Sequence, residues 1–160
     1  MVIRKKIAIP VRSPIKEGEK MNTDKLVGAW TLISSIQSRN NVISRTFGDP
    51  PSGQIQYTND GRMSAFLMDP DWARTGKNAV EESDRFFAYA GRWELDGNKV
   101  SHFIEFCSAP TKIGTTFVRN LNFLSENEIE LTTERETTKS GNVYETKLIW
   151  RRHVLSKNVV

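Results

Sequence analysis

Apolar and polar side chains alternate with a period of two along most of the chain after residue 26. Neighbouring side chains on a β-strand point to opposite faces, so this period predicts strands with one buried face. Short turns rich in Gly, Asn, Asp and Ser separate most of the strands, which is typical of antiparallel hairpins. The predicted strands cover residues 30–37, 55–58, 63–68, 89–95, 100–107, 116–124, 129–135 and 143–154.

Longer connections interrupt this pattern at two places. Residues 43–54 hold two glycines and two prolines, so we expect them to form a loop outside the sheet, and residues 69–76 predict a second loop. Asn78, followed by Glu81 three positions later, resembles a helix N-cap pair and predicts a helix over residues 80–87.

Eight or nine strands joined mostly by hairpins must either stack into a sandwich or close on themselves. Closure removes the exposed strand edges on which other chains can pair. We therefore expect an all-β fold, a closed antiparallel up-and-down β-barrel of eight to nine strands with one short helix between strands. A chain of 160 residues is the usual size for one such domain.

The net charge of +4 comes from the first 20 residues, which carry six basic and two acidic side chains. The remaining residues carry equal numbers of each sign, so we expect no nucleic-acid partner. We expect residues 1–22 to form a flexible basic extension and residues 23–156 to form the barrel domain. An alternative hypothesis starts translation at Met21, because residues 16–21 can be encoded by a purine-rich stretch that resembles a bacterial ribosome-binding site.

Other classes of protein are disfavoured by what the chain contains. No apolar run approaches the roughly 20 residues of a membrane-spanning helix, and residues 7–11 are too short for the apolar core of an export signal. The one cysteine, Cys107, forms no internal disulfide, and His102 and His153 are the only histidines. We expect a cytoplasmic protein with no metal and no cofactor.

Five segments resemble the bacterial and fungal lipocalin-like domain family. They are LVGAW at residues 26–30, PSGQIQYTNDGRMSA at 51–65, YAGRW at 89–93, VSHFIE at 100–105 and LIWRR at 148–152. The first carries the Gly-x-Trp signature of calycin and lipocalin barrels, and the last is similar to their terminal strand. The resemblance covers residues 26–152 and implies a lipocalin-like barrel. A few similar barrels serve in biosynthetic pathways, which links the family to secondary metabolism.

The Gly-x-Trp signature predicts how one end of the barrel closes. Gly28 lets the chain bend into the first strand, and the Trp30 indole plugs the end. Arg152 shares a strand face with Trp150, and we expect its guanidinium to lie over the Trp30 ring.

Strand parity predicts which side chains point into the barrel. On the first strand, positions 30, 32, 34 and 36 share one face. On the later strands the expected ligand-contacting residues are Tyr57, Tyr89, Trp93, Ile104, Phe106, Phe117, Leu121, Tyr144 and Trp150.

Two polar side chains, His102 and Arg119, project from otherwise apolar faces. A histidine there can transfer a proton, and an arginine can hold a carboxylate, an enolate or a carbonyl oxygen. The resemblance supports both positions, because similar sequences repeat them. Structural roles are the alternative: a hydrogen-bonded core histidine, and an arginine paired with Glu105 or Glu130.

Three functions remain open at this stage. The first is binding of one hydrophobic small molecule, such as a polyketide- or terpenoid-like metabolite, inside the barrel. The second is a cofactor-independent cyclase, isomerase or dehydratase, with His102 as general acid or base and Arg119 stabilising a carbonyl or oxyanion. The third is a barrel filled by its own side chains. The sequence leaves the oligomeric state undetermined.

Overall fold

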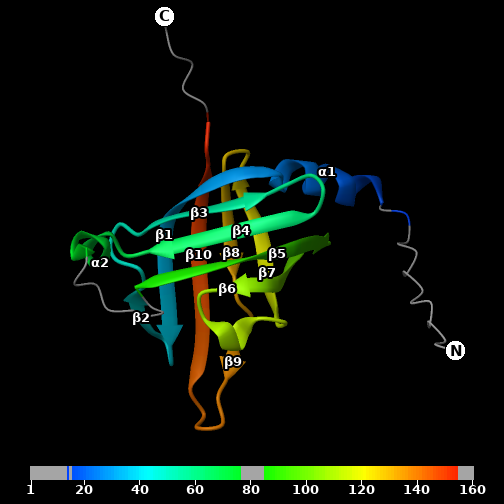
Figure 1. The fold of residues 1–160 in the computed structure, drawn as a ribbon. Helices are drawn as coiled ribbons and strands as arrows, with labels where there is room; N and C mark the ends of the chain where they lie inside the picture. Colours follow the sequence, from blue (N-terminus) through cyan, green and yellow to red (C-terminus); the bar gives the residue numbers. More distant parts are fainter. Residues whose placement is uncertain (1–13, 15, 77–84, 155–160) are drawn as a thin grey trace, which may run out of the picture.

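The fold is one antiparallel sheet that closes into a barrel (Figure 1). A computed structural model describes residue 14 and residues 16–76 and 85–154. The helices are α1 (Glu17–Leu26) and α2 (Pro70–Arg74), with a 3-10 turn, η2 (Pro110–Lys112). The strands are β1 (Gly28–Arg39), β2 (Val42–Arg45), β3 (Ser52–Tyr57), β4 (Arg62–Met68), β5 (Phe86–Asp96), β6 (Lys99–Cys107), β7 (Thr116–Ser125), β8 (Glu128–Thr132), β9 (Glu136–Thr137) and β10 (Val143–Arg152).

Eight of these strands form the barrel wall, in the order β1-β3-β4-β5-β6-β7-β8-β10, and pairing between β1 and β10 closes it. The two additional strands, β2 and β9, pair with the far ends of β1 and β10. In Figure 1, strands β3 to β6 cross β10 and β8 steeply, so the two halves of the sheet pack face to face. The expected closed antiparallel barrel is confirmed.

The connections differ from the expectation in three places. The segment 43–54 contributes residues to β2 and β3 and is therefore only partly a loop. The short helix between strands is α2, which follows β4: the Asp69 carboxylate caps it by accepting from the Asp71 amide, and Pro70 occupies its first turn. Most of the helix expected over residues 80–87 lies outside the described residues, but Phe86 and Phe87 belong to β5.

The helix α1 was not predicted, and it spans the expected boundary between the extension and the barrel. Glu17 and Glu19 in its first turn and Lys25 in its last turn suit the helix dipole. Among its residues only Leu26 is buried, so the helix is attached to the barrel at its C-terminal end and projects outward (Figure 1). The N-terminal part of the expected extension, residues 1–13 and 15, lies outside the described residues.

Two β-bulges change which side chains point inward. On β1 the register against β10 shifts between Leu32 and Ser34, so Ser35 becomes buried in place of Ser34. On β6 the residues paired with Ala90 and Gly91 are Phe106 and Ile104, which leaves Glu105 as the extra residue. A bulge inserts one residue into one strand and reverses the alternation beyond it.

The β6 bulge makes the prediction for Phe106 wrong. Its side chain is 63% exposed on the outside of the barrel. Gly91 permits the bulge, because a Cβ atom there would lie 1.8 Å from the Phe103 carbonyl oxygen. Beyond the bulge, Cys107 takes the inward position opposite Tyr89 and packs against the core.

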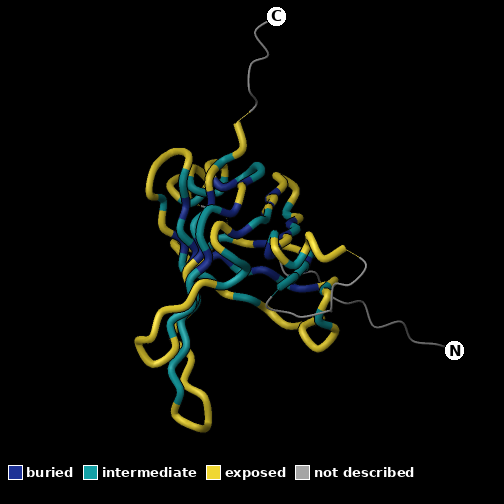
Figure 2. Tube along the Cα trace, turned by 90° about the vertical axis from the view of Figure 1, so that its left-hand side faces the viewer, coloured by how far each residue is buried: buried dark blue, intermediate teal, exposed yellow. Residues whose placement is uncertain are grey.

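The core fills the barrel body, whereas the projecting hairpins and loops are exposed (Figure 2). At the α1 end, Trp30 is fully buried and its indole N–H donates to the Leu26 carbonyl at 2.9 Å. The Arg152 guanidinium lies 4.2 Å from the Trp30 ring centroid and donates to the carbonyl oxygens of Val27 and Lys25. Gly28 has a φ of +131°, and a Cβ there would approach Arg152 to 3.1 Å. This arrangement places the three predicted closure residues together at one end.

Candidate functional site

A hydrogen-bonded chain of three side chains crosses the barrel interior. Tyr57 at the end of β3 has its hydroxyl 2.8 Å from Nε2 of His102 on β6. The hydroxyl of Tyr89, on β5, lies 3.3 Å from Nδ1 of the same ring. All three residues are buried, and His102 is fully inaccessible. Side chains from β3 and β5 therefore both contact the imidazole that β6 contributes.

The surroundings keep these three hydrogen-bonded side chains uncharged. Burial, with a smaller contribution from the positive charge of Arg119, lowers the pKa of His102 from 6.5 to about 3. Burial likewise raises the pKa of both tyrosines above the usual 10.0. At neutral pH the imidazole has one N–H and one bare nitrogen, so it can relay a proton but does not act as a cationic acid.

Arg119 lies next to the hydrogen-bonded Tyr57, His102 and Tyr89, and no carboxylate among the described residues pairs with it. It is half-buried on β7, and its guanidinium carbon is 5.1 Å from the centroid of the Phe117 ring. The guanidinium donates to the Val118 carbonyl at 3.1 Å. Both acids considered as partners are used elsewhere: Glu105 pairs with Arg62, and Glu130 pairs with Lys147. The expected alternative of an ion pair at Arg119 is therefore wrong for both acids.

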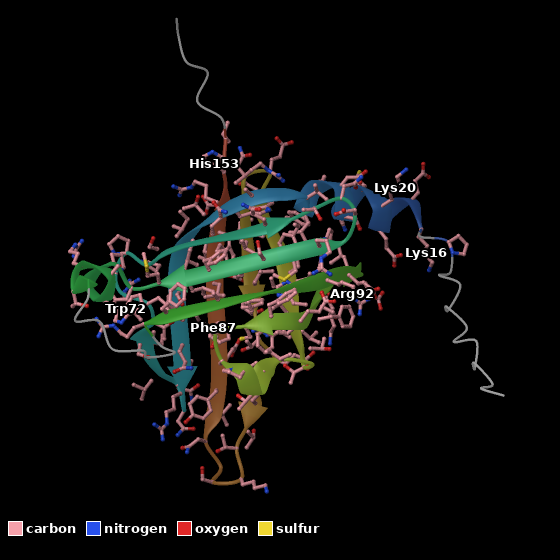
Figure 3. The ribbon with its side chains drawn as sticks, in the orientation of Figure 1. Lys16, Lys20, Trp72, Phe87, Arg92 and His153 are labelled. Atoms are coloured by element: carbon pink, nitrogen blue, oxygen red, sulfur yellow. The ribbon has the colours of Figure 1, made fainter. Side chains whose placement is uncertain are left out.

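Aromatic rings connect Arg119 to the histidine chain. Phe117 is the neighbour of His102 in the β6–β7 register, and its ring meets that of Tyr89 edge to face at 5.2 Å. Phe87, labelled on β5 in Figure 3, lies 5.5 Å from the Tyr89 ring and 6.3 Å from the Phe117 ring. Phe87 and Phe117 are both only half-buried. Together they form an apolar surface beside the unpaired guanidinium.

The remaining predicted ligand contacts are divided between the core and the periphery. Ile104, Leu121, Trp93 and Trp150 are buried in the core. Trp93 donates its indole N–H to the Thr58 carbonyl at 3.0 Å. Tyr144 lies apart from these residues, on the projecting end of β10 that pairs with β9.

Phe87 is the site residue that the sequence reasoning missed. It lay in the expected helix, although its odd position continues the inward series 87, 89, 91 and 93. This alternation indicated that β5 begins before residue 89, the first residue of the expected strand.

Three hollows lie outside the histidine site. One of about 490 Å³ lies between α1, the turn 59–62 and the end of β5, where Figure 3 labels Lys20 and Arg92. Trp93 is the one predicted ligand contact among its lining residues. A second, of about 300 Å³, lies between the projecting ends of β1 and β10, and a third, of about 530 Å³, lies along β1 and β2.

The described part of the chain contains neither a cluster of metal ligands nor a membrane-spanning helix. No group of three or more histidine, cysteine, aspartate or glutamate side chains there could hold a metal ion. Neither of the helices in residues 16–76 and 85–154 has the length and apolar character needed to cross a bilayer.

A closed eight-stranded antiparallel barrel, plugged at one end by a tryptophan and an arginine, defines a lipocalin-like protein. The lipocalin-like domain family matches residues 27–153, and the chain belongs to that family. The sequence matches no protein with a curated function.

Solved structures show similar barrels at low sequence identity. A lipocalin-like protein from Bacteroides uniformis is 15% identical with a TM-score of 0.45, covering 81% of this chain and 99% of that one. A redesigned β-barrel is 12% identical with a TM-score of 0.42, covering 82% and 95%. A de novo fluorescence-activating β-barrel is 12% identical with a TM-score of 0.41, covering 82% and 96%. The lipocalin-like barrel is consistent with binding a small hydrophobic ligand.

Proposed function

We propose that this protein binds one hydrophobic small molecule, of polyketide- or terpenoid-like size, at the half-buried aromatic surface of the barrel. The observation that carries the proposal is the unpaired Arg119 guanidinium beside Phe117 and next to the buried Tyr89 hydroxyl. Ligand sites are mostly apolar and contain a few placed polar groups, and this arrangement has both parts.

The charge of Arg119 favours a ligand that carries an oxygen acceptor. Removing a guanidinium from water costs free energy unless an acceptor replaces the lost hydration. The described acids do not supply that acceptor, because Glu105 and Glu130 face other cations. A ligand oxygen at this position would accept hydrogen bonds from the Arg119 guanidinium. The apolar part of the ligand would pack on Phe87 and Phe117.

The neutral fluorophore N-phenyl-1-naphthylamine tests this proposal, because its emission rises when it enters an apolar site. We expect saturable binding to the full chain, weakened by Phe117→Ser. The matched control is Val118→Ser, since Val118 is 37% exposed on the opposite face of the same strand. Binding that is absent, or equally weakened by both variants, would overturn the proposal.

A second candidate function is a cofactor-independent cyclase, isomerase or dehydratase acting on such a metabolite. The hydrogen-bonded chain from Tyr57 through His102 to Tyr89 supports it, because a neutral imidazole can accept a proton at one nitrogen and release one from the other. Arg119 would stabilise the developing oxyanion.

Comparison of two variants separates the two functions. His102→Gln and Arg119→Met are each assayed for ligand binding and for product formation in the producing cell. If product continues to form with both variants, the enzymatic function is overturned, and the fluorophore experiment with Phe117→Ser and Val118→Ser decides the binding function. Loss of product with retained binding supports the enzyme.

A further inference from the structure

We infer that the spare polar groups inside the barrel are mainly hydrogen-bond donors, so that it favours apolar ligands carrying carbonyl or carboxylate oxygens over alcohols and amines. The inference rests on the proposed binding function and specifies its ligand class. It follows from counting the protons of the buried polar side chains, among them the indole N–H of Trp150.

The histidine chain has one proton more than it needs. Tyr57, Tyr89 and neutral His102 together carry two O–H protons and one N–H proton. The chain contains two hydrogen bonds, at Nε2 and at Nδ1, and each uses one proton. No other hydrogen bond of either hydroxyl occurs among the described residues. One tyrosine O–H is therefore left to donate to something else, whichever tautomer the imidazole adopts.

The two distances indicate which hydroxyl is free. The 2.8 Å contact at Nε2 matches a phenol O–H donating to a bare nitrogen, and the 3.3 Å contact at Nδ1 fits the weaker N–H donation to a phenol oxygen. In this arrangement Tyr57 donates to His102, and His102 donates to Tyr89. The spare O–H then belongs to Tyr89, whose ring contacts the half-buried Phe117 beneath Arg119.

Trp150 provides an independent donor in the same barrel. Its side chain is 1% exposed, and its indole Nε1 has no hydrogen-bond partner among the described residues. An indole N–H can only donate, and a buried donor without an acceptor is costly, so native proteins rarely leave one without a protein partner, a water or a bound group. Trp150 belongs to the inward face of β10, opposite Leu32 and Ile129.

Strong acceptors are scarce among the described buried side chains. Apart from His102, the buried polar residues are Ser35 and Asp69. Ser35 is hydrogen-bonded to Thr46, and Asp69 is occupied by the Asp71 amide and Arg85. The phenol and hydroxyl oxygens keep lone pairs and are weak acceptors, whereas the spare protons are those of the Tyr89 O–H, the Trp150 N–H and the Arg119 guanidinium.

Displacement of N-phenyl-1-naphthylamine by four ten-carbon probes tests the ligand class. The probes are decanoic acid, decan-2-one, decan-1-ol and decylamine, which share a chain and differ in the polar group. We expect the acid to displace best and the ketone to exceed the alcohol by about 10-fold, because the alcohol's own O–H would find only a phenol or hydroxyl oxygen as a weak acceptor. Decylamine should displace least.

Variants assign each donor. Arg119→Met should remove the advantage of the acid and keep that of the ketone over the alcohol, whereas Tyr89→Phe or Trp150→Phe should reduce the ketone's advantage. Arg151→Met, an exposed cation paired with Glu128, is the control and should change nothing. Equal displacement by all four probes would overturn the inference and leave the proposed function standing. Absence of fluorophore binding would overturn both.

The tautomer of His102 is a readout that needs no ligand. Nitrogen-15 NMR of the histidine ring distinguishes a protonated nitrogen from a bare one. We expect a bare Nε2 and a protonated Nδ1, with His153 as the exposed reference ring. A protonated Nε2 would overturn the assignment of the spare O–H to Tyr89.

Discussion

The Tyr57 hydroxyl lies 2.8 Å from Nε2 of His102 inside the barrel, although the two residues are 45 positions apart. The bond occupies an imidazole nitrogen that no water reaches, because His102 is fully buried. Burial also keeps the ring neutral, since the charged form would lose its hydration. The burial of this pair in the core therefore makes the stability of the protein depend on pH.

Acidification is expected to destabilise the protein through His102. The folded pKa, about 3, lies below the unfolded value of 6.5, so the unfolded chain binds the proton first. The contribution is complete above pH 6.5 and is lost as the pH falls from 6.5 towards 3. Between pH 7 and pH 5 the free energy of unfolding should fall by about 2 kcal/mol from this group alone.

Urea unfolding of the wild type and of His102→Gln at pH 5 and pH 7 measures the contribution of His102 to the pH dependence of the unfolding free energy. The variant should lose that part of the pH dependence, whereas His153→Gln, a change at an exposed ring, should retain it. An identical pH slope in the wild type and His102→Gln would contradict the expectation.

The two tyrosines should differ in their contribution to stability. Tyr57→Phe removes the short bond and leaves Nε2 unpaired, so we expect a loss of about 1–3 kcal/mol. Tyr89→Phe removes the longer bond, at 3.3 Å, and should cost less. Denaturant unfolding at pH 7 compares them, and a larger loss for Tyr89→Phe would contradict the assigned direction of the bonds.

Gly91 is expected to tolerate no side chain. A Cβ there would lie 1.8 Å from the Phe103 carbonyl oxygen, so Gly91→Ala must displace backbone at the β6 bulge. We expect a loss of about 3 kcal/mol or more in the free energy of unfolding, or no soluble protein. Gly18→Ala is the control, because nothing lies near that position on α1, and alanine favours a helix by up to about 1 kcal/mol.

Arg152 should stabilise the closed end of the barrel. Arg152→Met loses the contact with Trp30 and the bonds to the Val27 and Lys25 carbonyls, and we expect a cost of about 2 kcal/mol. Arg151→Met on the exposed face should cost less than about 0.5 kcal/mol. Thermal unfolding of both variants provides the comparison, and equal melting temperatures would contradict it.

The outward position of Phe106 can be tested against the inward position of Ile104. Phe106→Ser removes an exposed ring and should change the free energy of unfolding by less than about 0.5 kcal/mol. Ile104→Ser places a hydroxyl in the core and should cost about 3 kcal/mol or more. A comparable loss for both would mean that β6 keeps its alternation without a bulge.

Local sequence signals predicted most of the strands, whereas the closed barrel was inferred from the removal of exposed strand edges and from the family resemblance. A period of two and a tight turn such as Asn59-Asp60-Gly61 act over a few residues, and the observed hairpin of β3 and β4 follows them directly. The Gly-x-Trp signature also placed Trp30 and Arg152 correctly relative to each other, since the two occupy the paired first and last strands.

The alternation failed where a bulge reversed it. Ser35 is buried in place of Ser34, and Phe106 is exposed, because each lies beyond an inserted residue. A bulge depends on how a strand fits its neighbour, as the approach of Gly91 to Phe103 shows. Alternation within one strand therefore does not predict where a bulge occurs.

The alternation of this chain predicted strands with one apolar face and singled out His102 and Arg119 as polar exceptions, while the removal of strand edges and the family resemblance favoured a barrel over a sandwich. Only the folded arrangement brought the Tyr57 and Tyr89 hydroxyls to opposite nitrogens of His102. Among the described residues it also left Arg119 without an acid and the Trp150 N–H without an acceptor. These relationships depend on atomic distances between strands, which sheet closure and register set. Periodicity along a single strand determines which face a side chain takes but not which partner it meets.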